Sequence, residues 1–198
     1  SKRCCRIKLI SGMRNDMLRM PDKPVCWGIE AMPGVVIEVR KASTPDGPAL
    51  LPLVEAYWRH ERIAGFSPDR VGAQLERLLC HSRLGAGWIA RMGEAPVGYL
   101  LAFCVFSLEH LGLTVEIDEF FVLPQHRGTG TGMQLLGAAE AEFARIGCTN
   151  ISLQLARDNN AARRFYQHNG YCERSGYELP DKSVDCDRDM NPKRGDGF

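Results

Sequence analysis

The segment from Thr114 to Gly147, TVEIDEFFVLPQHRGTGTGMQLLGAAEAEFARIG, decides the fold that we expect for this chain. Its first part is an apolar, β-branched and aromatic run that ends at a proline, which predicts a strand. Glycines at alternate positions then predict a tight loop, at Gly128, Gly130 and Gly132. Apolar residues recur at helical spacing after the loop until Gly147, where a helix is expected to end. The segment therefore predicts a strand, a glycine loop and a helix.

Such a unit predicts an anion site, because loop N–H groups and the helix N-terminus carry partial positive charge. Glycine also lets the backbone approach a ligand closely, so a phosphate or pyrophosphate is expected. A P-loop needs Gly-Lys followed by Ser or Thr, and no lysine follows these glycines. A dinucleotide fingerprint needs glycine where Met133 stands, and no acidic residue ends a second strand about twenty residues later. A glycine turn without any ligand remains the alternative.

Two motifs carry a resemblance to a known family. Residues 127–132, RGTGTG, match R-x-x-G-x-G and resemble the acetyl-CoA pyrophosphate loop of the GNAT superfamily of N-acetyltransferases. Residues 159–171, NNAARRFYQHNGY, match N-x-x-A-x-x-F-Y-x-x-x-G-Y/F and resemble the second signature block of the same superfamily. Alone, the second motif is also explained by a capped amphipathic helix, but the two together favour the family. The resemblance covers about residues 35–178.

Composition indicates a globular domain of ordinary size. The chain has 198 residues, of which 44% are hydrophobic, and its formal net charge is +1. A net charge this close to zero does not favour a nucleic acid or a membrane as a partner. No apolar run approaches the roughly 18 residues of a membrane-spanning helix. Residues 1–20 carry charges throughout and lack the apolar centre of a signal peptide. We therefore expect a cytoplasmic protein.

The cysteines favour free thiols over a metal site. None of the eight forms a C-x-x-C pair, so no zinc site is expected. Four of them lie in or beside predicted elements, which predicts buried free thiols in a reducing cytoplasm: Cys80, Cys104, Cys148 and Cys172.

The sequence predicts one catalytic domain between two flanking segments. Residues 1–34 are basic at the start and interrupted by prolines, and they form either a non-core N-terminal extension or an arm that pairs with a partner subunit. Residues 35–178 form the predicted N-acetyltransferase domain, and residues 179–198 a loosely ordered tail. We expect the protein to be a homodimer.

The order of predicted elements is that of an α/β (α+β) fold. Strands are expected at 35–40, 87–91 and 96–106, from residue 114, at 151–155, and from residue 171. Helices are expected at 50–58, from Pro68, at 133–147, and after a cap at Asn159 or Asn160. The resemblance implies the GNAT fold, with a central mixed, mostly antiparallel sheet of six to seven strands flanked by about four helices. It also implies that strands four and five splay apart and that pantetheine lies between them.

The resemblance further implies which residues hold acetyl-CoA. The backbone of Val122 and Leu123 would bind the pantetheine amides. Asn159 would reach the pantetheine arm, and Ala162 lies one helical turn before Tyr166 on the same face. The pyrophosphate would be held by the loop residues Arg127, Gly128, Thr129, Gly130, Thr131 and Gly132.

Acetyl transfer to an amine needs a base for the amine and an acid for the leaving thiolate. Tyr166 resembles the general acid of the family, with a buried core tyrosine as the alternative. For the base, Glu116 and Asp118 alternate onto one strand face, while Glu119 points the other way unless a bulge intervenes. Residues 117–122, IDEFFV, look like the acidic pair of polyamine and thialysine acetyltransferases, which maps the base onto Asp118. That family has Glu followed by Asp, whereas here Asp precedes Glu. An acidic edge that discourages strand pairing is the alternative.

The acceptor is expected to be a primary amine of a small molecule that attacks acetyl-CoA directly. Glu119 and the first-helix residues Glu55 and Glu61 are candidates for binding it. An acidic cleft would favour polyamine-like or aminoglycoside acceptors, and an open groove would favour a peptide. A protein lysine or N-terminus is the alternative acceptor, and an inactive acyl-CoA sensor is a third hypothesis.

Overall fold

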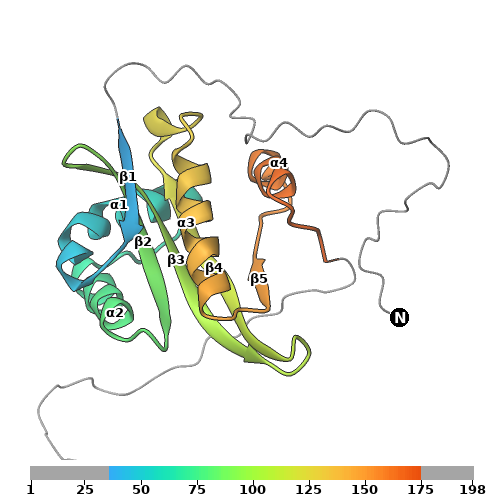
Figure 1. Ribbon diagram of the computed structural model, residues 1–198. Coiled ribbons are helices and arrows are strands. Elements are labelled where there is room, and N and C mark those ends of the chain that lie inside the picture. The colour runs from blue at the N-terminus through green and yellow to red at the C-terminus, as the bar shows by residue number, and fades with distance from the viewer. Residues whose placement is uncertain (1–35, 175–198) are drawn as a thin grey trace, which may run out of the picture.

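The computed structural model describes residues 36–174, and Figure 1 shows their arrangement. The predicted extension and tail lie outside these residues. The elements follow in the order β1 (Ile37–Lys41), a 3-10 turn η1 (Thr44–Asp46), α1 (Gly47–Glu61), α2 (Pro68–Cys80), β2 (Gly85–Met92), β3 (Ala95–Ser107), β4 (Gly112–Val122), a 3-10 turn η2 (Pro124–His126), α3 (Thr131–Arg145), β5 (Asn150–Leu153) and α4 (Asn160–His168).

A single mixed sheet has the strand order β1-β2-β3-β4-β5. The first four strands pair antiparallel, and β5 pairs parallel to β4. This confirms the predicted mixed, mostly antiparallel sheet with helices around it. The described part contains five strands instead of six to seven, because residues 171–174 have no regular structure and later residues lie outside it.

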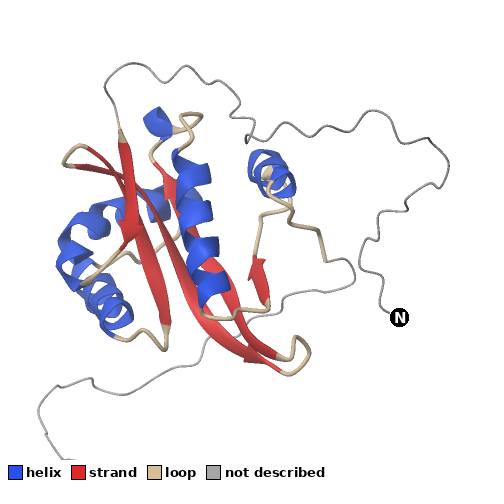
Figure 2. Cartoon of the chain, in the orientation of Figure 1, coloured by secondary structure: helices blue, strands red, loops and turns tan. Residues whose placement is uncertain are grey.

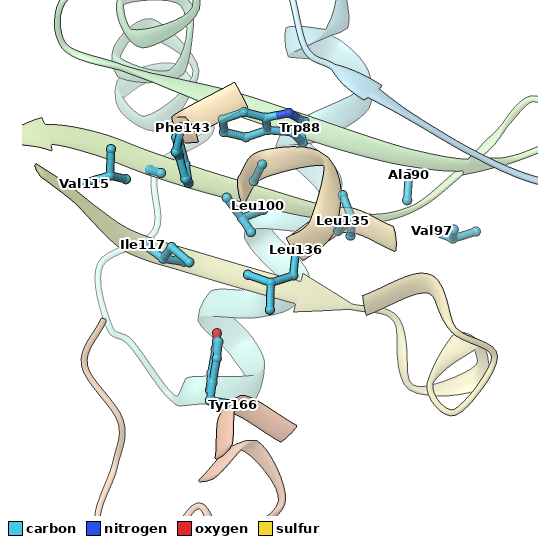
Figure 3. Close-up of a cluster of buried hydrophobic side chains, with 12 residues drawn as sticks. Trp88, Ala90, Val97, Leu100, Val115, Ile117, Leu135, Leu136, Phe143 and Tyr166 are labelled. Carbon is cyan, nitrogen blue, oxygen red and sulfur yellow. The ribbon is translucent and has the colours of Figure 1, made fainter. Parts of the chain in front are cut away.

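Helices cover both faces of the sheet (Figures 1 and 2). On one face, α1 and α2 bury Leu50, Leu53 and Leu78 against strand residues. On the other, α3 crosses the strands and its apolar stripe packs on the sheet, where the rings of Trp88 and Phe143 meet edge to face at 5.2 Å (Figure 3). Both cores are therefore made by amphipathic helices on a sheet that is apolar on each side.

The strands β4 and β5 separate partway along β4. Their pairing runs from Thr114 opposite Asn150 to Ile117 opposite Leu153, where β5 ends. The strand β4 continues to Val122 while it still pairs with β3. The second half of β4 therefore has an open edge, which confirms the predicted splay.

A β-bulge at Asp118 marks this point of separation. Glu119 lies opposite Leu101, but Ile117 lies opposite the next residue, Ala102, so Asp118 is the extra residue. A bulge reverses the alternation of side chains. Ile117 accordingly packs in the core under α3, whereas Phe121 packs in the core under α1 and α2.

The structure corrects two smaller expectations. The helix α1 extends beyond the predicted 50–58 at both ends, because a proline in its first turn starts it early and Arg62 ends it in the left-handed conformation at φ 58°. The prediction of buried thiols is wrong for Cys80 and Cys172, which are exposed; Cys104 and Cys148 are partly buried. Among residues 36–174, no helix is both long and apolar enough to cross a membrane.

Candidate active site

The loop between β4 and α3 offers a row of backbone N–H groups. Gly128 and Gly130 have positive φ angles of 75° and 87°, which glycine adopts without strain. Gly130 is the N-cap of α3 and has no side chain to satisfy the first-turn amides. Within the described part of the chain, no N–H from Gly128 to Gly132 donates to another protein group. These donors and the helix dipole fit a phosphate group.

The space above this loop is open. A Cβ added at Gly128 or Gly130 would meet no atom within 4 Å. Side-chain hydrogen bonds within the loop fix its conformation. The Thr129 hydroxyl donates to the His126 carbonyl at 2.8 Å and lies 2.9 Å from the hydroxyl of Thr131. The loop therefore has an ordered base and a free face for an anion.

Arg127 contacts β4 and α1. Its Nε donates to the Val122 carbonyl at 2.9 Å, its guanidinium carbon lies 5.5 Å from the centre of the Phe121 ring, and its Nη2 lies 3.5 Å from His60 Nε2. A role for this side chain in holding pyrophosphate thus requires it to leave these contacts or to share its donors.

The two residues predicted to bind pantetheine differ in their free backbone groups. The N–H of Leu123 donates to the Val97 carbonyl at 2.9 Å, and its carbonyl accepts from His126 at 2.8 Å. Leu123 therefore has no free N–H for a ligand. The Val122 carbonyl retains a second lone pair beside the Arg127 bond and lies at the open edge of β4.

A pocket opens where β4 and β5 separate. Its walls come from the end of α1, the bulged part of β4, the end of β5 with the following loop, and α4, and its lining residues are Tyr57, Glu61, Ile117, Asp118, Phe120, Leu153, Gln154, Leu155, Ala156, Asn159, Ala162 and Tyr166. The glycine loop is its neighbour, since a Cβ added at Gly132 would lie 3.6 Å from Cζ of Phe120.

Asp118 presents its carboxylate to this pocket. The Asp118 carboxylate makes no hydrogen bond or ion pair with another described residue. The pocket walls partly desolvate the carboxylate, and Glu116 adds repulsion, so the pKa of Asp118 lies above its usual value. A carboxylate with a raised pKa is suited to accept a proton. Glu116 does not line the pocket; its Oε1 accepts from Gln154 Nε2 at 2.8 Å.

Glu119 is held by two donors. Trp58 Nε1 donates to its Oε1 at 3.1 Å, and the Tyr99 hydroxyl donates to its Oε2 at 2.8 Å. Burial raises the pKa of Glu119, while these two hydrogen bonds oppose the rise. Glu119 thus faces α1 and is fixed in place, and it is not among the residues that line the pocket.

Tyr166 enters the pocket from α4. Its ring is buried against Phe120, Phe165 and Tyr171, and Figure 3 shows its hydroxyl directed toward the sheet. The hydroxyl makes no hydrogen bond with a described residue. Burial raises the pKa of Tyr166, with a smaller contribution from Tyr57, so the phenol remains a proton donor at neutral pH.

The start of α4 fixes the position of this tyrosine. The Asn159 side chain accepts from the Ala162 N–H at 3.1 Å as the helix N-cap. The pocket is lined by three residues from the start of α4, Asn159, Ala162 and Tyr166. The face of α4 that was predicted to meet the co-substrate is therefore the face that lines the pocket. The amide nitrogen of Asn159 makes no hydrogen bond with a described residue and is available to a ligand, while its oxygen caps the helix.

The helix α1 supplies one pocket residue that the sequence did not single out, Tyr57, and one predicted candidate for binding the acceptor, Glu61. Tyr57 lines the pocket, and burial together with Glu119 and Glu61 raises its pKa to about 12. Glu61 lines the pocket one turn later, whereas Glu55 pairs with Arg59 at 2.9 Å and lies outside it. The spacing of Tyr57 and Glu61, four residues apart, was the available signal for a shared face.

Comparisons with known proteins identify the family. The model of the acetyltransferase (GNAT) family matches residues 50–171, so the chain belongs to this family of acetyltransferases. It is similar to an uncharacterized N-acetyltransferase, YhfO, of Bacillus subtilis, with 30% identity over 71% of this chain and 93% of the relative. It is also similar to the aminoalkylphosphonate N-acetyltransferase of Salmonella typhimurium, with 33% identity over 69% of this chain and 85% of the relative.

Solved structures confirm the fold. An integron cassette protein from the mobile metagenome of Cole Harbour Salt Marsh superposes with a TM-score of 0.66 at 26% identity, over 74% of this chain and 90% of that one. The aminoglycoside N-acetyltransferase AAC(6')-Iy, solved in complex with CoA, superposes with a TM-score of 0.67 at 20% identity, over 76% of this chain and 97% of that one.

Proposed function

We propose that this protein transfers acetyl from acetyl-CoA to a primary amine of a small molecule by direct attack. The observation that carries the proposal is one pocket that contains both a free carboxylate, Asp118, and a protonated phenol, Tyr166, beside a loop of free N–H groups. Relatives named for small amine substrates, the aminoalkylphosphonate and aminoglycoside enzymes, support the choice of acceptor class.

The loop from Gly128 to Gly132 is suited to the pyrophosphate of CoA, and the open edge of β4 at Val122 to the pantetheine arm. The co-substrate supplies a thioester whose carbonyl is open to an amine. Asp118 accepts the proton of the amine as nitrogen bonds to the carbonyl carbon. Tyr166 donates its proton to the sulfur as the carbon–sulfur bond breaks, and it regains a proton from solvent. No protein group is acylated in this scheme.

The choice of a small acceptor over a folded protein rests on the relatives, and the pocket that would hold it is lined by side chains of α1, β4, the end of β5 and α4. A cytoplasmic homodimer remains our expectation, and sedimentation of the purified protein measures the oligomeric state.

The experiment combines binding and turnover. CoA should raise the melting temperature of the full chain, because a ligand that binds only the folded state stabilises it by mass action. Free thiol should be released from acetyl-CoA when small primary amines are added, and not when lysine peptides replace them. A thermal shift without turnover on any amine would favour an acyl-CoA sensor, and turnover on peptides alone would favour a protein acetyltransferase.

A further inference from the structure

The hairpin that joins β3 to β4 extends past the ends of β2 and β5 and exposes a group of apolar side chains (Figure 1). These side chains, which we call the hairpin patch, are those of Val105, Phe106, Leu108 and Leu111. The last three are 74%, 81% and 88% exposed. Together the four offer about 500 Å² of apolar surface, which is as large as the main patch of a typical monomer and often marks an interaction site.

Leu111 has a backbone conformation that its side chain disfavours. Its φ angle is 57°, in the left-handed region, and its N–H donates to the Leu108 carbonyl at 3.2 Å to close the turn. Hairpin turns often place a left-handed residue here, but that residue is usually glycine. A leucine is strained at this position, and its exposed side chain gains no packing among the described residues that offsets the strain. The stability of a single copy therefore does not explain Leu111.

The same hairpin has an open sheet edge at Phe106. The strand β2 pairs with β3 only as far as Gly85 opposite Phe103, and the next bond on that side joins the Cys104 N–H to the Leu84 carbonyl at 2.9 Å. Backbone groups alternate in direction along an antiparallel strand, so the N–H and C=O of Phe106, two residues later, point to the same side. Within residues 36–174, no strand pairs with β3 there. An open edge beside exposed apolar side chains is a template for another strand.

The chemistry of this region fits a second copy of the chain. Residues 103–113 contain neither Lys nor Arg, which a nucleic acid or an anionic membrane would attract. Their one acidic residue, Glu109, already pairs with Arg174 at 2.5 Å, so two copies can approach without strong repulsion. An antiparallel strand edge is its own complement about a two-fold axis, because each copy offers the same donors and acceptors. Two hairpin patches buried on each other would remove about 1,000 Å² from water, which reaches the lower limit of a specific interface.

We propose that two copies of this chain associate through their β3–β4 hairpins, with the β3 edges paired antiparallel about a two-fold axis near Phe106 and the hairpin patches packed on each other. This inference goes beyond the proposed function and does not depend on it. The arrangement leaves both pockets open, because Asp118 lies six residues along β4 from Gly112, roughly 20 Å from the hairpin.

Sedimentation velocity of the full chain over a concentration series tests the association. The parent should change from monomer to dimer with a Kd of about 1–10 μM, as expected for a small interface. Leu111→Asn should raise this Kd at least about tenfold, because it removes an apolar contact at the centre of the interface. The melting temperature of the dilute monomer should stay equal or rise in this variant, since asparagine adopts the left-handed conformation more readily than leucine. Ile63→Asn is the matched control, because Ile63 is also exposed but follows α1, and it should leave the Kd unchanged.

A photocrosslinking phenylalanine analogue in place of Phe106 identifies what covers the open edge. In a mixture of isotope-labelled and unlabelled chains, it should join residues 103–113 of two different chains. Crosslinks to residues 1–35 or 175–198 would show that a flanking segment covers the hairpin and would overturn the proposal, as would a monomer at every concentration. A Leu111→Asn variant that melts at a lower temperature as a dilute monomer would assign Leu111 to the fold of one copy and overturn its role in the interface.

Discussion

The hydroxyl of Tyr99 donates a 2.8 Å hydrogen bond to Oε2 of Glu119, and this bond connects the centre of β3 to the bulged part of β4. Tyr99 is fully buried. Because Trp58 of α1 donates to the other oxygen, Glu119 connects a helix and two strands directly beside Asp118. The carboxylate is therefore better suited to position the bulge than to move a proton.

We expect Tyr99→Phe to destabilise the fold by about 1–3 kcal/mol at neutral pH, since it removes a donor from a half-buried carboxylate. Loss of the donor raises the folded-state pKa of Glu119 further above its unfolded value. The difference between variant and parent should therefore be largest above the folded-state pKa and should shrink as the pH falls through it. Urea unfolding at several pH values measures this, and an equal difference at every pH would contradict it.

Many of the helix and strand boundaries can be predicted from local sequence. The contacts that fix the position of Glu119 cannot. Ser67-Pro68 correctly predicts the start of α2, and the apolar run that stops at Pro124 correctly predicts where β4 ends. The helix α3 begins at Thr131, before the apolar period starts, because Gly130 takes a positive φ and caps it. Such a cap depends on a backbone angle that a hydrophobic pattern does not encode.

The site shows the same limit. The sequence could predict that Asp118 and Tyr166 are chemically suited to the reaction, and it could name a bulge as a condition for the orientation of Glu119. It could not place the bulge, because the register shift depends on how β3 pairs with β4. The roles of Tyr57 and Trp58 likewise depend on where α1 packs on the sheet, which helical spacing alone does not determine.

We predict that Gly130→Asp abolishes the thermal shift caused by CoA. The substitution places a Cβ and an anion in the open space above the loop, where phosphate is expected. Gly147→Asp is the matched control, because Gly147 also has a positive φ, of 75°, and open space around it but lies beyond the other end of α3. The control should lower the melting temperature and keep the shift with CoA. Equal shifts in both variants would remove the loop from the binding site.

Asp46 provides a prediction about stability in acid. It is buried and accepts from Arg40 at 2.5 and 2.8 Å and from the Ser43 N–H at 2.9 Å. These partners, Arg40 above all, lower the pKa of Asp46. Its contribution to folding is thus fully present above the unfolded pKa of about 3.9 and is lost as the pH falls through the folded pKa.

Asp46→Asn should accordingly cost about 2 kcal/mol at neutral pH, because the amide cannot replace the charged hydrogen bonds. The cost should decline below about pH 4. Chemical unfolding of parent and variant between neutral and acidic pH measures it, with the exposed Glu76→Gln as a control of near-zero effect. A difference that grows on acidification would show that another group dominates.

Asp118→Asn should lower kcat/KM by about a hundredfold or more, in line with the contribution of a general base. In the parent, kcat/KM should fall as the pH drops through the raised pKa of Asp118, because the protonated carboxyl cannot accept the proton. The variant should not show this fall in kcat/KM at acidic pH. Its kcat/KM should rise partly at high pH, where more of the amine is deprotonated. Glu116→Gln, which disturbs the bond to Gln154 and removes a charge that repels Asp118 but keeps the Asp118 carboxylate, should have a smaller effect. The reverse order of the two losses would assign the base to Glu116.

Tyr166→Phe keeps the buried ring and removes only the hydroxyl in the pocket. If this hydroxyl protonates the leaving thiolate, kcat should fall by about a hundredfold or more while the thermal shift with CoA persists. The raised pKa of Tyr166 keeps it protonated across the assay range, so the parent should show no loss of activity from its ionisation near neutral pH. Tyr171→Phe is the matched control, because its ring packs 5.3 Å from Tyr166 but its hydroxyl donates to Glu140 outside the pocket. Tyr57→Phe tests the other pocket phenol, and a large loss there with full activity in Tyr166→Phe would transfer the acid role from α4 to α1.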